Sequence, residues 1–90
     1  MKKYLYDRMY AEAVSELFMG KIKENEMRLE SVAKSIGIKY NTLFRYLDGS
    51  RQIPLDIFQK LCQHLGLDFV ETFQLTNQIA TEKTLKEFKG

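Results

Sequence analysis

One stretch of sequence decides the fold of this chain: Leu29-Glu-Ser-Val-Ala-Lys-Ser-Ile-Gly-Ile-Lys-Tyr-Asn-Thr-Leu-Phe-Arg-Tyr-Leu-Asp-Gly49. Apolar residues recur at helical spacing in both halves, as Val32, Ala33 and Ile36, and again as Leu43, Tyr46 and Leu47. Gly37 separates the halves at a point where a residue that tolerates positive φ ends a helix. The stretch therefore predicts two short helices, 29–36 and 40–48, that meet at a tight corner.

Helices this short cannot bury an apolar stripe alone, so the pair needs further helices around it. Apolar periodicity predicts three, over residues 3–24, 54–65 and 69–79. Residues 80–90 fit either a short amphipathic helix or a frayed tail. Because no segment alternates as a strand does, we expect a compact all-α fold of five helices, with a long N-terminal helix, as a single domain over residues 1–90.

Local signals mark the ends of the later helices. Pro54 stands where a helix can begin, since the missing N–H of proline costs nothing in the first turn. Gly66 stands where that helix would stop. Asp68 and Glu71 have the spacing of a capping box that opens the last helix.

The composition indicates an ordinary globular protein, with 44% hydrophobic residues, one proline and five glycines. No apolar run approaches the roughly 18 residues of a membrane span, and the N-terminus lacks the apolar core of a signal peptide. We therefore expect a cytoplasmic protein with no membrane partner. The single cysteine, Cys62, excludes an internal disulfide.

The N-terminal helix carries more apolar surface than one small core requires. Its stripe comprises Tyr6, Tyr10, Ala13, Val14, Leu17 and Phe18, widened by Leu5, Met9 and Ile22. The excess suggests a second contact, either with the C-terminal tail or with another subunit. The alternative is simply that tyrosines tolerate exposure to water.

Positive charge is concentrated in the central helix pair. Residues 28–51 carry a net charge of +3, against 0 for residues 1–27 and −1 for residues 52–90. A nucleic-acid partner would require cations on the surface that it contacts. The alternative is a chance excess on a solvated surface.

The segment from Arg28 to Phe73 resembles the lambda-repressor and Cro-like helix-turn-helix family. The shared features are the apolar-Ala step Val32-Ala33, the Gly37-Ile38 corner, the inward Leu43 and Leu47, the helix end Asp48-Gly49, Pro54, and Leu65-Gly66-Leu67. The order and spacing of these features make the resemblance fairly specific. Two departures stand out, because Arg28 and Lys39 occupy positions where family members usually have a capping Ser or Thr.

In this family the second motif helix lies in the DNA major groove and its first residues contact base edges. The resemblance therefore implies that the outer face of 40–48 reads bases through Tyr40, Asn41, Phe44 and Arg45. The side chain of Asn41 can form two hydrogen bonds with adenine, and that of Arg45 can form two with guanine. The ring of Phe44 can pack on a thymine methyl group. Three alternatives stay open: Phe44 packs inward, Asn41 caps its helix locally, and Arg45 is merely a solvated charge.

The resemblance also implies phosphate contacts and a dimer. The candidates for phosphate contact are Arg28, Lys34, Lys39, Thr42, Ser50 and Arg51. Family members usually bind paired half-sites as two-fold dimers. Our dimer candidates are Phe69, Val70 and Phe73, with Leu85 and Phe88 in the tail. The alternative is that these residues close the core of the monomer.

The sequence offers no support for catalysis or for a cofactor. His64 has no Cys or acidic residue at ligand spacing, and Cys62 falls on an apolar stripe. No small-molecule substrate is evident. We predict a sequence-specific double-stranded DNA-binding repressor of the phage or bacterial type. The alternative is a helix-turn-helix module that binds other proteins, as an antirepressor or adaptor.

Overall fold

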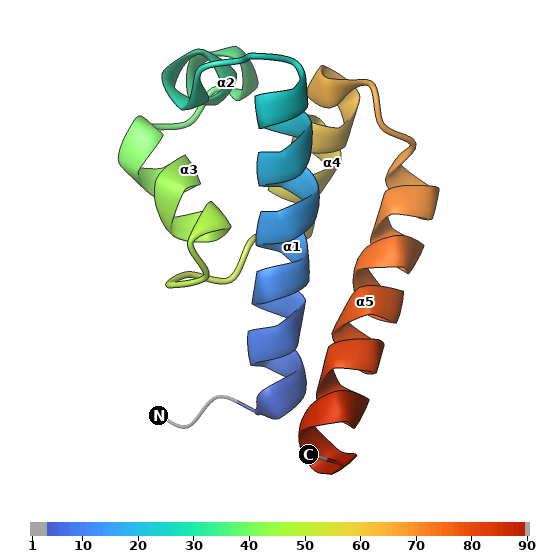
Figure 1. Cartoon of the computed structure of the whole chain (residues 1–90). Helices are drawn as coiled ribbons and strands as arrows, with labels where there is room; N and C mark the ends of the chain where they lie inside the picture. The colour runs from blue at the N-terminus through green and yellow to red at the C-terminus, as the bar shows by residue number, and fades with distance from the viewer. Residues whose placement is uncertain (1–3, 90) are drawn as a thin grey trace.

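The computed structural model of this chain describes residues 4–89, and these residues form helices with no strand. The helices are α1 (Leu5–Glu24), α2 (Leu29–Ile36), α3 (Tyr40–Leu47), α4 (Leu55–Leu65) and α5 (Phe69–Lys89) (Figure 1). The prediction of an all-α fold of five helices with a long N-terminal helix is confirmed.

Apart from the end of the last helix, the predicted helix boundaries differ from the observed ones by at most two residues. The helix expected over 3–24 runs over Leu5–Glu24, and residue 3 lies outside the described part of the chain. Pro54 precedes α4 as its N-cap in extended conformation, with ψ 152°. Asp48 follows α3 as its C-cap. Each residue therefore lies just outside the helix that was predicted to contain it.

The last helix is longer than the sequence indicated. Residues 80–89 continue α5 without a break, so they form neither a separate short helix nor a frayed tail. Ala80 is completely buried and Thr76 likewise, because this part of α5 packs along α1. At the other end of the helix, Asp68 Oδ1 accepts a hydrogen bond from the backbone N–H of Glu71 at 2.8 Å, which is the predicted N-cap.

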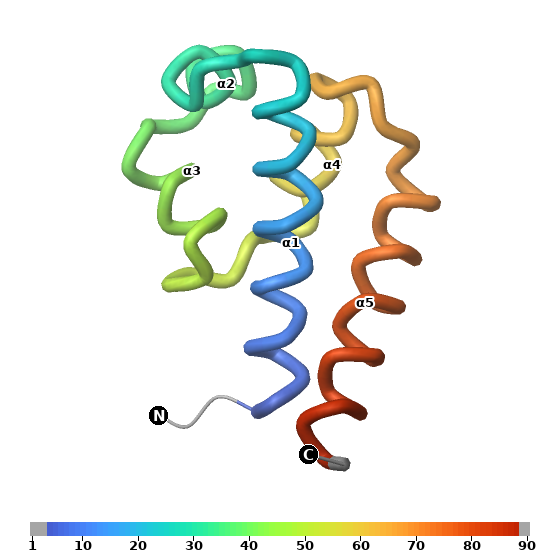
Figure 2. Tube along the Cα trace, viewed as in Figure 1, coloured from blue at the N-terminus to red at the C-terminus, as the bar shows by residue number. Residues whose placement is uncertain are grey.

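Helices α1 and α5 run antiparallel along each other, with α2 and α3 on the opposite side of α1 (Figure 1). The first turn of α1 and the last turn of α5 lie at the same end of the molecule (Figure 2). Helix α5 therefore covers the extra apolar surface of α1, as one of the two sequence-based alternatives expected. It does so without shielding the outer face of α3.

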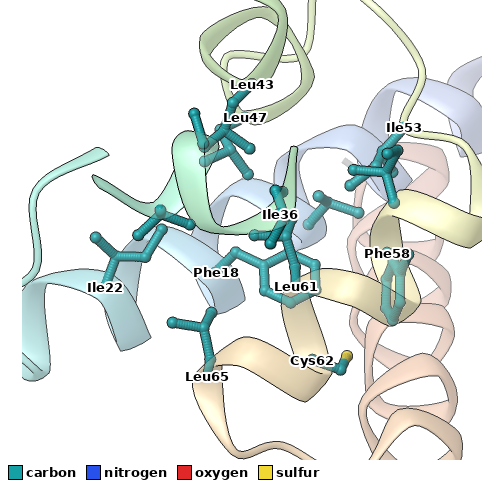
Figure 3. Packing of buried hydrophobic residues seen from close by; sticks show 14 residues of the cluster. Phe18, Ile22, Ile36, Leu43, Leu47, Ile53, Phe58, Leu61, Cys62 and Leu65 are labelled. Carbon is teal, nitrogen blue, oxygen red and sulfur yellow. The ribbon is translucent and has the colours of Figure 1, made fainter. Parts of the chain in front are cut away.

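The core consists mainly of side chains from the first four helices, and α5 packs against it. Phe18 of α1 meets Phe58 of α4 edge to face, with ring centroids 5.0 Å apart (Figure 3). Leu43 and Leu47 of α3 complete the buried cluster. Burying one such side chain contributes about 1.5–3 kcal/mol, so these contacts hold α3 firmly in place.

Two polar links join α1 to α5. The hydroxyl of Tyr6 donates to Oδ1 of Asn77. Lys83 Nζ lies 2.8 Å from a carboxylate oxygen of Glu16 and 3.6 Å from one of Glu12. Ion pairs this exposed contribute little to stability.

Candidate nucleic-acid interface

The corner between α2 and α3 depends on one glycine. Gly37 has φ 81° and ψ 29°, in the left-handed region that residues with a Cβ rarely adopt. The N–H of Ile38 donates to the carbonyl of Ala33 at 3.0 Å and closes the end of α2. Ala33 itself is buried. The corner fixes the direction in which α3 leaves α2, and so the direction of its outer face.

Helix α3 divides cleanly into an inner and an outer face. Leu43 and Leu47 are 0% and 3% exposed and point into the core. The four side chains predicted to read bases are all exposed and lie together on the outer face: Tyr40, Asn41, Phe44 and Arg45. The inner face therefore anchors the helix while the outer face is presented to solvent.

The structure decides two of the alternatives left open by the sequence. Phe44 is 47% exposed, so it does not pack inward against α2. The side chain of Asn41 is exposed and makes no hydrogen bond to another described residue, so it does not cap α3. Both groups are directed outward, where a partner can reach them.

Arg45 lies near one acidic group but forms no close ion pair with a described residue. The Ser50 hydroxyl and backbone N–H donate to the Asp48 carboxylate and lower its pKa, and the charge of Arg45 lowers it further. The N–H donates at 2.8 Å. Asp48 is thereby held in place by the loop, which leaves the guanidinium of Arg45 available.

The first turns of α2 and α3 lack the side-chain caps that helices usually have. Arg28 and Lys39 occupy the N-cap positions in extended conformation, and neither makes a capping hydrogen bond. The first backbone N–H groups of an α-helix have no partner inside it, and the positive end of the helix dipole lies there. A cation and free amides at the same point form a site that suits an anion such as phosphate.

The other predicted phosphate contacts are less uniform. Lys34 and Arg51 are exposed, and Thr42 is half-buried. The hydroxyl of Ser50 already donates to Asp48, so this side chain stabilises the loop and is not a free donor. The sequence could not reveal this, because an Asp and a Ser two residues apart form such a turn only in a suitable loop.

The predicted dimer residues are divided between the core and the surface. Phe69 and Phe73 pack edge to face on Phe58, with centroids 5.9 and 5.7 Å away, so both help to close the monomer. Val70 is 59% exposed. Leu85 and Phe88, near the end of α5, are exposed as well. The exposed members are therefore the ones available to a second subunit.

No site for metal or nucleophilic chemistry emerges among the described residues. Residues 4–89 contain no cluster of three or more His, Cys, Asp or Glu side chains that could hold a metal ion. Burial raises the pKa of the Cys62 thiol, which disfavours the thiolate. None of the described helices combines the length and the low polarity that crossing a membrane requires.

The geometry defines a helix-turn-helix unit whose second helix begins at the exposed Lys39 and carries Arg45 on its exposed face. A family model described as helix-turn-helix matches residues 21–71, more than half of the chain. The chain therefore belongs to the lambda-repressor-like helix-turn-helix family, whose members are DNA-binding regulators. The match extends from the last turn of α1 to the first turn of α5. No curated protein and no solved structure matches the chain significantly.

Proposed function

We propose that this chain is a sequence-specific repressor of the phage or bacterial type, which acts in the cytoplasm by occupying an operator in double-stranded DNA. One observation carries the proposal: Asn41 and Arg45 are exposed on one face of α3, directly beyond the uncapped cationic start of that helix at Lys39. Base-reading chemistry and phosphate-binding chemistry are thus adjacent on the surface that the family places against DNA.

Each outer side chain has a definite role in this proposal. Arg45 donates two hydrogen bonds to O6 and N7 of a guanine, and Asn41 pairs with N6 and N7 of an adenine. Tyr40 and Phe44 lie beside these two contacts and present aromatic surface to the duplex. A good bidentate contact discriminates against the wrong base by about 1–3 kcal/mol.

Phosphate contacts supply the register and much of the affinity. In this proposal the four cationic contacts come from Arg28, Lys34, Lys39 and Arg51, together with the amides at the start of α2 and α3. Thr42 and the loop at Ser50 lie beside the DNA backbone, next to these cationic contacts. Releasing about four counterions per subunit contributes about −3.6 per subunit to the slope of log affinity against log salt.

We further propose that the active form is a homodimer on a two-fold symmetric site. One domain of this size contacts few base pairs, and pairing doubles the contacts. Val70, Leu85 and Phe88 support this proposal, because they are apolar and exposed on α5. Phe69 and Phe73 contribute only the edges that the core leaves accessible.

A second function has one observation in its favour. Tyr40 and Phe44 are large, exposed aromatic side chains on the outer face of α3, and exposed aromatics are enriched at protein-binding surfaces. In that case α3 would bind another protein, as in an antirepressor or adaptor. The two functions differ in how binding responds to salt.

Selection of bound sites from random duplex DNA tests the proposal. We expect a two-fold symmetric consensus, and Arg45→Ala should relax the preference at one position in each half-site. Lys60→Ala is the matched control, because Lys60 is an exposed cation on α4; its consensus should be that of the wild type. Absence of DNA binding even at low salt would refute the proposal and favour the protein-binding function.

A further inference from the structure

Tyr40 and Phe44 form an aromatic pair on the outer face of α3. Their ring centroids are 6.2 Å apart with the planes 24° from parallel, so the rings stack on each other across one helical turn. The two side chains are 44% and 47% exposed. A stacked pair is more rigid than two independent side chains, and it leaves its free apolar surface directed away from the core.

The pair is flanked by cations and by polar base readers. Lys39 directly precedes Tyr40, and Arg45 directly follows Phe44. Asn41 lies three residues before Phe44, one turn away on the same outer face. An apolar protein surface would find these charges unfavourable, whereas the anionic backbone and polar base edges of DNA complement them. The aromatic pair is thus set within a surface suited to nucleic acid.

A phenyl ring reads only one feature of the major groove. Its carbon atoms neither donate nor accept hydrogen bonds, and base edges there consist of polar groups with a single apolar exception. That exception is the methyl group on C5 of thymine. Methylated cytosine carries the same group on the equivalent carbon. The ring of Phe44 therefore complements a C5-methylated pyrimidine and makes less apolar contact with an unmethylated one.

We propose that Tyr40 and Phe44 together recognise the C5-methyl group of a pyrimidine, with Phe44 in contact with the methyl group and Tyr40 holding its ring in place. This inference rests on the proposed function, because it requires α3 to lie in the major groove. It adds a specificity determinant that hydrogen bonding alone does not supply. The consequence is that methylation of a cytosine at this position strengthens binding.

The test uses the full-length chain and synthetic duplexes that carry its selected site. Replacing one thymine at a time by uracil removes a methyl group and leaves base pairing intact. Burial of one methyl group is worth about a fourfold change in affinity. We therefore expect one position in each half-site where uracil weakens binding about fourfold. At the same position, 5-methylcytosine should bind about fourfold more tightly than cytosine.

Variants of Phe44 assign the effect to the aromatic pair. Phe44→Ser should abolish the uracil penalty at that position, and Phe44→Leu should keep part of it because leucine remains apolar. The side chain is exposed, so neither variant threatens folding. Leu75→Ser is the matched control: Leu75 is 43% exposed on α5, away from α3, and its variant should show the full penalty.

Two outcomes would overturn the inference in distinguishable ways. If the chain binds its selected site with a steep salt dependence but tolerates uracil at every position, the proposed function stands and methyl recognition is refuted. The same conclusion follows if the penalty persists undiminished in Phe44→Ser. If no duplex binds at low salt, both the inference and the proposed function fail together.

Discussion

Replacing Lys39 by serine should make the fold more stable and DNA binding weaker. The backbone of Lys39 already has the extended conformation of an N-cap residue, with φ −73° and ψ 148°. A serine there could accept a hydrogen bond from the N–H of Asn41 or Thr42 without rearrangement, which is worth about 1 kcal/mol. Removing a cation from the positive end of the helix dipole adds about 0.5 kcal/mol. The expected stabilisation is therefore about 1.5 kcal/mol.

The same substitution removes one cation from the surface proposed to contact phosphates. The slope of log affinity against log salt should become shallower by about 0.9 per subunit. Urea unfolding at an unchanged m-value measures the gain in stability, and titration of duplex DNA at several salt concentrations measures the loss in binding. Opposite signs in the two assays are expected because, under the proposed function, lysine at this position contacts a phosphate but cannot cap the helix.

Lys86→Ser provides the matched control, since Lys86 is an exposed cation near the far end of α5. Stability should change by less than about 0.5 kcal/mol and the salt slope should not change. If Lys39→Ser leaves both the affinity and the salt slope unchanged, Lys39 does not contact a phosphate. If the stability does not rise, the missing cap at the start of α3 does not lower the stability of the fold.

Three further outcomes are expected. Phe58→Ala should destabilise the fold by about 3–5 kcal/mol in urea unfolding, because Phe58 is completely buried among three other aromatic rings. Lys34→Ala should weaken binding to all duplexes alike, whereas Arg45→Ala should cost about 1–3 kcal/mol on the selected site only; a reversed pattern would contradict their assignments. The lowered pKa of Asp48 implies stability that is fully present above its usual value of 3.8 and is lost as pH falls through the lower folded-state pKa. Asp48→Asn should flatten this part of the acid-unfolding curve, and an unchanged curve would show that the hydrogen bonds from Ser50 do not stabilise the fold.

The central motif could be predicted from sequence because its determinants are local. Gly37 was expected where a helix must end in the left-handed region, and it has φ 81°. Asp68 was expected to cap the last helix, and it accepts the hydrogen bond from Glu71. Signals of this kind act within four or five residues, so no knowledge of distant contacts is needed.

The second half of α5 was not predictable in the same way. Residues 80–89 are mostly polar, and their own periodicity favours no particular state. Burial of Ala80 against α1 stabilises the helix there, and Lys83 lies beside Glu16 of α1. These partners lie more than 60 residues away in sequence, so only the folded chain brings them together. Tertiary packing thus supplied what intrinsic propensity did not.

The candidate interface depends partly on local sequence signals and partly on tertiary packing. The sequence by itself determined the two short helices, their corner and the excess of cations between residues 28 and 51. The spacing of apolar residues, the glycine at the corner and the charges depend only on residues that are close together in the chain. Only the tertiary structure decided that Phe44 faces solvent and stacks on Tyr40, and that Phe69 and Phe73 serve the core. An amphipathic helix has two borders between its faces, and the direction of a residue on such a border depends on what the neighbouring helices already fill.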